Sequence, residues 1–146
     1  MNAQIQYYQQ KLDFEWDAAD LFEELEKGSN VVIVDTRKRF AYETEHIPGA
    51  VSISHRTMDE QATRTLDRKP IYVCYCDGIG CNGSTKGSLK MTKLGFRVRE
   101  LIGGLDWWKR DGYATEGTEA SRRNGNQMRM LVRTGIAQIL FFLFDY

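Results

Sequence analysis

Short apolar runs alternate with helical patterns of apolar residues along most of the chain, which predicts an α/β fold. The runs are rich in β-branched residues and stay apolar at consecutive positions, as strands covered on both faces do. The predicted strands are 31–34, 50–53, a run from Ile71 that ends at Cys76, and 96–102. The predicted helices are 13–27, 40–45, 57–66, 84–94 and a final turn after Gly103-Gly104. Strands that alternate with helices pair in parallel through right-handed crossovers, so we expect a parallel sheet with helices on both faces.

Local signals mark both ends of the first predicted helix. Asp17 precedes an alanine pair, where its side chain would cap the helix, and Gly28 occupies the place of a left-handed C-terminal residue. A Pro48-Gly49 pair marks a turn into the second strand. We therefore expect the chain to change direction at these points.

The last part of the chain has a different pattern. Residues 121–127 are polar and basic, as in a linker, and the apolar positions that follow lie on one helical stripe. The stripe comprises Met128, Leu131, Val132, Ile136, Ile139, Leu140 and Leu143. We expect a domain over residues 1–117 and an extension over 118–146, whose apolar helix packs on the domain or against a second chain in a homodimer. The apolar stretch 136–144 is far shorter than the roughly 20 residues of a membrane-spanning helix, so no membrane anchor is expected.

Composition narrows the functional classes. The chain has 20 basic and 20 acidic residues, and this balance gives no electrostatic reason to expect a nucleic acid or an acidic membrane as partner. Its three cysteines, an odd number, do not make a disulfide framework and suit a reducing compartment. Residues 1–13 are polar and lack the basic flank and apolar core of a signal peptide, so a cytoplasmic location is expected.

The stretch that begins at Ile71 carries the strongest chemical signal. A strand there ends at Cys76, and a loop with glycines at 78, 80 and 83 then opens a helix. This order places a thiol over unpaired backbone N–H groups and a helix dipole, both of which favour negative charge. A cysteine held in this way can have its pKa lowered from about 8.5 to roughly 3.5–7.5. We therefore predict that Cys76 is a nucleophile in its thiolate form.

Polar residues that follow other predicted strands should meet this thiol at one edge of the sheet. Asp35 and Arg37 follow the first strand, and His55 follows the second. Arg37 could orient an anionic substrate, but we favour a structural role in which it pairs with Asp35, Glu43 or Glu45. His55 is a second candidate for the pocket wall, and the sequence leaves this role and a solvent-facing one equally open.

The other two cysteines carry weaker signals. Cys74 lies inside the predicted strand and is interpreted as part of the core. Cys81 is either a packing residue of the loop or a second thiol that resolves an oxidised or persulfidated Cys76 as a disulfide. Together with His46 and His55 the thiols could suggest zinc. Their Cys-x-Cys-x4-Cys spacing matches none of the usual structural zinc motifs, so no metal is expected.

Four spaced motifs resemble a known family. They are Asp35-Thr36-Arg37, His46-Ile47-Pro48-Gly49-Ala50, the Cys76 loop, and Gly103-Gly104 followed by Trp108. Their order over residues 14–113 is similar to that in rhodanese-like domains. The resemblance implies a five-stranded parallel sheet flanked by helices, and sulfurtransferase activity. In such enzymes a loop cysteine takes a sulfane sulfur from a donor such as thiosulfate, becomes a persulfide, and passes the sulfur to cyanide or a thiol.

The resemblance also assigns the site. Cys76 matches the family's catalytic cysteine, and no cofactor is implied. The anion-binding loop would consist of Asp77, Gly78, Ile79, Gly80, Cys81 and Asn82. The implied partners are a small-molecule sulfur donor and a thiol acceptor.

This chain departs from the common pattern at Cys81. Many members of the family carry an arginine near this position, the fifth after the catalytic cysteine, whereas a subgroup resembling this chain has a Cys-x-Gly-x-Gly-Cys-Asn-Gly loop. A pocket lined mostly by backbone would favour a persulfide or polysulfide donor over dianionic thiosulfate.

Other functions fit the residues less well. A phosphatase or an arsenate reductase clamps its oxyanion with a loop arginine, and residues 77–82 contain none. A thiol redox protein is a further alternative, because Cys81 lies close to Cys76 in the sequence. A non-catalytic binding module is another, although such copies typically lack the cysteine that this chain retains.

Overall fold

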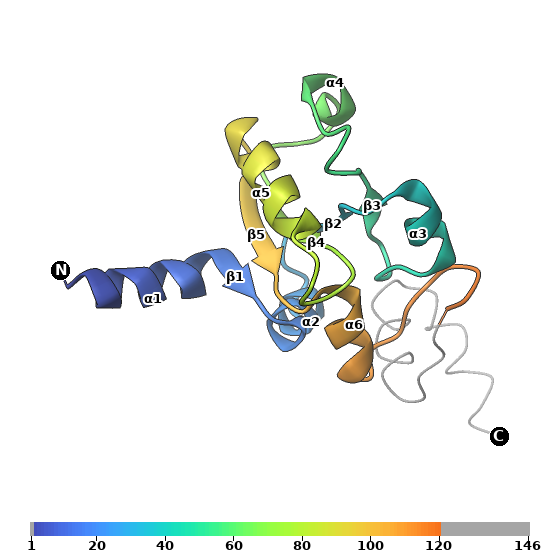
Figure 1. The fold of residues 1–146 in the computed structure, drawn as a ribbon, viewed down its shortest axis with the longest axis horizontal. Helices are drawn as coiled ribbons and strands as arrows, with labels where there is room; N and C mark the ends of the chain where they lie inside the picture. Colours follow the sequence, from blue (N-terminus) through green and yellow to red (C-terminus); the bar gives the residue numbers. More distant parts are fainter. Residues whose placement is uncertain (1, 121–146) are drawn as a thin grey trace.

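A sheet of five parallel strands organises residues 2–120, the part of the chain that the computed structural model describes (Figure 1). The strands are β1 (Glu15–Trp16), β2 (Val31–Asp35), β3 (Val51–Ser52), β4 (Ile71–Tyr75) and β5 (Arg97–Leu101). Their order across the sheet is β1-β5-β4-β2-β3, and each neighbouring pair is parallel. β4 therefore lies in the middle, so that the residue after it stands at the centre of the carboxyl edge.

Helices cover both faces of this sheet. They are α1 (Ala3–Phe14), α2 (Ala18–Glu26), α3 (Arg39–Thr44), α4 (Glu60–Thr63), α5 (Gly83–Lys93) and α6 (Gly104–Arg110). Side chains alternate along β4, so that Val73 and Tyr75 pack on one face and Tyr72 and Cys74 on the other. The first face packs against α2 and α6 through Leu21, Phe22, Leu105 and Trp108. The second packs against Met91 of α5 and against Met58, Phe96 and Val98. The predicted α/β class with helices on both faces is confirmed.

Most predicted boundaries lie within one residue of the observed ones between β2 and β5. The exception is the predicted helix 57–66, of which only α4 is helical. The Asp59 side chain accepts a hydrogen bond from the Ala62 amide (2.8 Å), which makes Asp59 the cap and excludes helix before it. Without an apolar stripe to bury, this surface segment gains nothing from a longer helix.

The predicted helix 13–27 is wrong at its N-terminal end, where the chain forms the end of α1, then β1, and only then α2. Asp17 is the cap, as predicted: its side chain accepts from the Asp20 amide (2.8 Å), and the Asp20 carboxylate accepts from the Asp17 amide (3.1 Å). This capping box holds Asp17 in an extended conformation, so a helix cannot continue through it. The two residues before it pair with β5 and supply the fifth strand. Gly28 has the predicted left-handed backbone, with a φ of 72°.

The N-terminal helix α1 was absent from the pattern-based expectations. It runs away from the sheet (Figure 1), and none of its residues is buried. Local interactions hold it: the Asn2 side chain accepts from the Gln4 amide (2.8 Å), and Lys11 pairs with Glu15 (2.6 Å). A helix that buries no face produces no apolar stripe in the sequence, which is why the pattern did not reveal it.

Within residues 2–120, no helix is long and apolar enough to cross a bilayer. The predicted linker, the apolar C-terminal helix and the homodimer through it lie outside the described residues. The division at residue 117 stays a prediction.

Candidate active site

The loop that follows β4 folds as a tight turn and leads directly into α5. The Cys81 amide donates to the Gly78 carbonyl (3.1 Å), and the Gly83 amide, in the first turn of α5, donates to Cys81 Sγ (3.4 Å). The Cys81 amide is thus committed to the turn and is not available to an anion. Among the described residues, the other five amides of the predicted anion-binding loop, those of Asp77, Gly78, Ile79, Gly80 and Asn82, make no hydrogen bond within the protein. They are the amides that this loop has left for a ligand.

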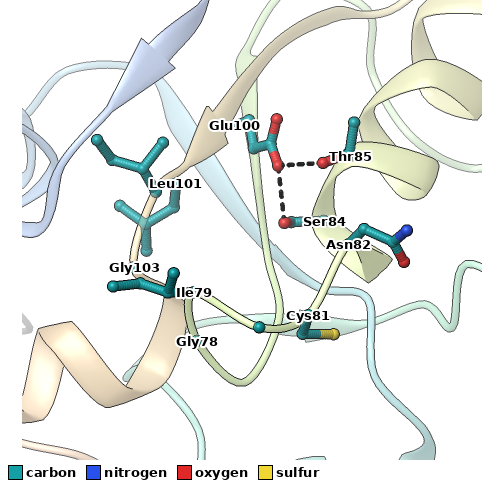
Figure 2. A pocket seen from close by; sticks show the side chains of 11 residues that line it. Gly78, Ile79, Cys81, Asn82, Ser84, Thr85, Glu100, Leu101 and Gly103 are labelled. Carbon is teal, nitrogen blue, oxygen red and sulfur yellow. Dashed lines mark hydrogen bonds between the residues drawn. The ribbon is translucent and has the colours of Figure 1, made fainter.

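A cavity of about 420 Å³ opens between this loop, the start of α5 and the end of β5 (Figure 2). Its lining residues are Gly78, Ile79, Gly80, Cys81, Asn82, Ser84, Thr85, Glu100, Leu101, Ile102 and Gly103. The hydroxyls of Ser84 and Thr85 donate to one oxygen of the Glu100 carboxylate, at 2.9 and 2.6 Å. Sequence reasoning missed this group. The available signal was a glutamate inside a predicted buried strand, which needs a polar partner.

The cavity does not gather every residue that the sequence proposed for the pocket. Five of the six predicted loop residues line it, whereas Asp77, Arg37, His55 and the predicted nucleophile Cys76 do not. Arg37 instead pairs with Asp77, and the His55 ring lies beside Gly83.

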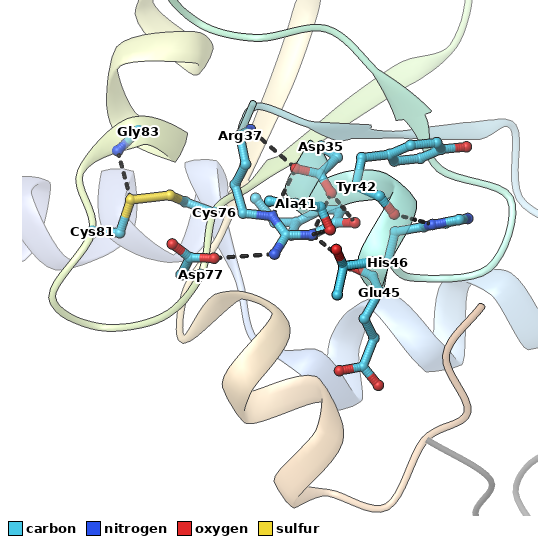
Figure 3. Close-up of polar contacts among 12 residues, drawn as sticks. Asp35, Arg37, Ala41, Tyr42, Glu45, His46, Cys76, Asp77, Cys81 and Gly83 are labelled. Atoms are coloured by element: carbon cyan, nitrogen blue, oxygen red, sulfur yellow. Dashed lines mark hydrogen bonds and ion pairs between the residues drawn. A yellow bond between two sulfur atoms is a disulfide. The ribbon is translucent and has the colours of Figure 1, made fainter. Parts of the chain in front are cut away.

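Cys76 follows β4 directly, and its Sγ is bonded to Cys81 Sγ (Figure 3). The site is therefore described in its oxidised state. Cys76 is 4% exposed, whereas Cys81 is partly exposed. Cys76 is buried but belongs to neither hydrophobic cluster of the sheet. Of the two interpretations of Cys81, the disulfide-forming one agrees with this structure.

The sulfur pair requires glycine at position 83 and has the His55 ring beside it. A Cβ atom at Gly83 would stand 3.0 Å from Cys76 Sγ, 3.4 Å from Cys81 Sγ and 3.2 Å from His55 Cδ2. Any larger residue would have to displace at least one of these groups. His55 is thus a neighbour of the disulfide, on a side of the loop that does not face the cavity.

Three cationic side chains lie close enough to His55 to affect its pKa. Its pKa is lowered, first by burial and then by the charges of Arg56, Lys86 and Lys90. The Lys90 ammonium also donates to the His55 carbonyl (2.5 Å). Because these cations belong to the same neighbourhood as the sulfur pair, the potential there favours a thiolate and an anionic donor.

The lowered pKa of His55 predicts a loss of stability in acid. Folding disfavours the charged imidazolium, so the unfolded chain takes up the proton first as pH falls. The stability that neutral His55 contributes is fully present above the ordinary pKa of about 6.5 and is lost as pH falls below it. Urea unfolding between about pH 7 and 5 should show this slope, and His55→Gln should flatten it. The chain has two histidines, so loss of one imidazole NMR signal in that variant identifies His55. Titration of that signal above its ordinary pKa would contradict the prediction.

Arg37 braces the loop from inside (Figure 3). Its Nε and Nη2 donate to the two carboxylate oxygens of Asp35 (3.0 and 2.7 Å), its Nη1 donates to Asp77 (3.0 Å), and its Nη2 also donates to the Glu45 carbonyl (2.6 Å). Burial lowers the pKa of the guanidinium, but the hydrogen bonds and charges of Asp35 and Asp77 outweigh it and raise the pKa above its ordinary value. The predicted pairing with Asp35 is confirmed. Glu43 instead pairs with Arg39.

The start of α6 supports the loop from a second direction. The amides of Leu105 and Asp106 donate to the carbonyls of Cys76 and Asp77 (3.0 and 2.9 Å). These bonds require close backbone contact at Gly104, which has a φ of 56° and where a Cβ would stand 2.4 Å from the Cys76 carbonyl oxygen. Only glycine permits this approach.

Gly104→Ala should therefore destabilise the fold and displace Cys76. The matched control is Gly28→Ala, because Gly28 also has a positive φ but a Cβ there meets nothing within 4 Å. Both substitutions place alanine at a positive φ, so the difference between their losses of unfolding free energy gives the cost of the clash at Gly104. We expect Gly104→Ala to lose about 1–3 kcal/mol more than the control in urea unfolding. Equal losses would show that the loop accommodates the methyl group.

Within residues 2–120, one group of side chains has the composition of a metal site, and its members are engaged in other bonds. Cys76, Asp77 and Cys81 have potential ligand atoms within 4.8 Å of one another, but both sulfurs are tied up in the disulfide and Asp77 pairs with Arg37. Cys74 is fully buried, and burial raises the pKa of its thiol to about 12. Its interpretation as a core residue is confirmed.

Comparisons with known proteins agree with this architecture. Residues 17–111 match the family model of the rhodanese-like domain. Thiosulfate sulfurtransferase GlpE of Coxiella burnetii is 34% identical over 87 residues, which are 59% of this chain and 78% of that protein. Among solved structures, the BH2092 protein of Bacillus halodurans has a TM-score of 0.77 and 36% identity over 88% of this chain and 96% of that one. The rhodanese-like domain of the Anabaena Alr3790 protein has a TM-score of 0.66 and 31% identity over 76% of this chain and 84% of that one. The chain belongs to the rhodanese-like family.

Proposed function

We propose that this protein is a sulfurtransferase that carries a sulfane sulfur as a persulfide on Cys76. The observation that carries the proposal is the place of Cys76: it follows the central strand, in a loop that turns into α5. Sulfurtransfer needs a thiolate, and the amides of the loop and the start of α5 favour one. The name of the Coxiella relative supports the same chemistry.

The reaction has two displacements on sulfur. The Cys76 thiolate attacks the outer sulfur of the donor. With thiosulfate, the donor S–S bond breaks, sulfite leaves with its electron pair, and Cys76 becomes a persulfide. A thiolate or cyanide then attacks the outer sulfur of the persulfide, and Cys76 leaves as the thiolate. A general base is not required if Cys76 is ionised before it reacts.

The charges around the loop bear on the choice of donor. Arg56, Lys86 and Lys90 add positive potential at His55, beside the sulfurs, and the one carboxylate of the loop, that of Asp77, shares Arg37 with Asp35. The loop itself offers amides and no arginine, so it lacks a bidentate clamp for an oxyanion. We infer that persulfide or polysulfide anions, which have no sulfonate oxygens for such a clamp to hold, are better donors than thiosulfate.

The disulfide must open before the site accepts sulfur, because Cys76 cannot be a thiolate while its sulfur is bonded to that of Cys81. A dithiol reductant would open it by thiol–disulfide exchange. Activity should therefore depend on prior reduction.

Intact-mass analysis tests the proposal. The chain is reduced, freed of reductant and incubated briefly with thiosulfate or with inorganic polysulfide, then quenched in acid. A gain of one sulfur on the peptide that contains Cys76, absent in Cys76→Ser, is expected, and polysulfide should produce it faster. Failure of both donors to add sulfur to the reduced chain and to its reduced Cys81→Ser variant would refute the proposal.

Phosphatase or arsenate reductase chemistry finds no support in the described residues. The loop lacks arginine, and Arg37, the nearest candidate described around the loop, is already held by two carboxylates and a carbonyl. Asp77 would in addition repel a phosphate dianion.

A further inference from the structure

We propose that Cys81 is the resolving thiol of the Cys76 persulfide, so that the reduced chain converts sulfane sulfur into hydrosulfide and closes the disulfide of Figure 3. The inference rests on the proposed function and goes beyond it. It assigns the chain a reductive release of inorganic sulfide, in addition to transfer of sulfur to an external acceptor.

The fold holds the two sulfurs within bonding reach. The Cα atoms of Cys76 and Cys81 are 6.2 Å apart, inside the usual disulfide range of about 4.4–6.8 Å. The turn that positions Cys81 is closed by its own amide bond to Gly78, so backbone contacts and not only the disulfide determine its place. A second thiol is therefore presented to Cys76 after every turnover.

Cys81 is the only candidate for this role among the three cysteines of the chain. Cys74 lies two residues before Cys76 within β4, where its thiol packs 3.7 Å from the Met91 sulfur and is fully buried. The pKa of Cys74 is raised to about 12 by that burial, which leaves almost no thiolate at neutral pH.

The surroundings of Cys81 suit an attacking and a leaving thiolate. The Gly83 amide donates to its sulfur at the first turn of α5, an eleven-residue helix whose N-terminus favours negative charge. Cys81 is also the more exposed sulfur of the pair. An external dithiol would therefore attack Cys81, and Cys76 would leave as the thiolate that the next donor needs.

The Cys81 thiolate attacks Cys76 Sγ, the inner sulfur of the persulfide, whose outer sulfur carries a proton. The bond between the two persulfide sulfurs breaks, and the outer sulfur leaves as hydrosulfide with that proton and the electron pair. The sulfane sulfur is reduced by two electrons, and the two cysteines are oxidised to the disulfide. A dithiol reductant, which becomes a disulfide itself, returns two electrons and two protons and restores both thiols.

A single-turnover experiment on the full chain tests this step. The protein is reduced, freed of reductant and mixed in the absence of an acceptor with one equivalent of thiosulfate, whose leaving group is sulfite and not hydrosulfide. Hydrosulfide is trapped with a bimane reagent and quantified, and the acid-quenched protein is weighed intact. For the wild type we expect hydrosulfide release with disulfide formation. In Cys81→Ser and Cys81→Ala the sulfur should instead stay on Cys76, and protein-dependent hydrosulfide should fall by about tenfold or more.

The outcomes separate the two proposals. The resolving role is supported if sulfur stays on Cys76 in both Cys81 variants and hydrosulfide is released only by proteins that retain Cys81. Equal hydrosulfide release from the wild type and these variants would overturn it while leaving the proposed function intact, as would a persulfide that migrates to Cys81. Failure of the wild type and both variants to acquire sulfur would instead refute the proposed function. Cys74→Ala, which removes the buried thiol beside Met91 and leaves both cysteines of the loop in place, serves as the matched control and should release hydrosulfide like the wild type.

Discussion

Cys76→Ser is expected to lower sulfur transfer from thiosulfate to cyanide by at least about a thousandfold. A serine hydroxyl at this position is not ionised at neutral pH, and it cannot form a persulfide. The loop should otherwise keep its shape, because the bonds from Leu105 and Asp106 reach backbone carbonyls and not the side chain at 76. Thiocyanate formation by the reduced protein measures the effect.

Cys74→Ala provides the control for thiol chemistry in general. Cys74 lies two residues earlier in the same strand but faces the core side packed against Met91. We expect this variant to keep most of the wild-type rate despite some loss of stability, since it removes a core side chain. A Cys76→Ser protein that retains a substantial part of the wild-type rate would remove Cys76 from the mechanism.

Arg37→Met should destabilise the fold by about 3–5 kcal/mol, since it leaves a buried carboxylate without its partner. Asp35 is fully buried, and the remaining side-chain donor to it is the Tyr75 hydroxyl (2.8 Å). The same substitution frees Asp77, whose carboxylate then adds uncompensated negative charge to the loop. We therefore expect weaker sulfur transfer as well, beyond what the unfolded fraction explains. Urea unfolding and a rate measurement on the folded protein check the two effects separately.

Arg39→Met is the matched control for Arg37→Met. Arg39 pairs with Glu43 (3.1 Å) one turn along α3, but both side chains are more than half exposed. Loss of such a surface pair should cost less than about 1 kcal/mol. Similar losses in the two arginine variants would show that the buried pair is no stronger than the exposed one.

The sequence predicted the strands and helices that bury an apolar face. Between β2 and β5 the pattern of apolar positions marks the elements within one residue, apart from α4, because burial on the sheet imposes that pattern. It missed α1, which buries nothing, and β1, whose two residues are too few to show a period. The fifth strand was expected only because of the family resemblance.

The sequence predicted which residues carry the chemistry of the site, but it did not predict most of the contacts between them. The strand-to-helix order marked Cys76, and the position of Arg37 after a strand marked its ion pair with Asp35. Contacts between distant segments were beyond the pattern. The fit of Gly104 against the Cys76 carbonyl and the approach of the His55 ring to the sulfurs depend on how loops meet in space, and no local spacing encodes that. The group of Ser84, Thr85 and Glu100 was missed for the same reason.

The lengths of the outer strands have a consequence for self-association. Both edges of the sheet, β1 and β3, are only two residues long, whereas each of the inner strands has five residues. A long exposed edge strand presents a row of unpaired amides and carbonyls on which another chain can add a strand, and so promotes aggregation. Here each edge offers a template too short for stable intermolecular pairing. Within residues 2–120, the sheet thus protects the protein from edge-to-edge growth while β4 stays the strand farthest from solvent-exposed borders.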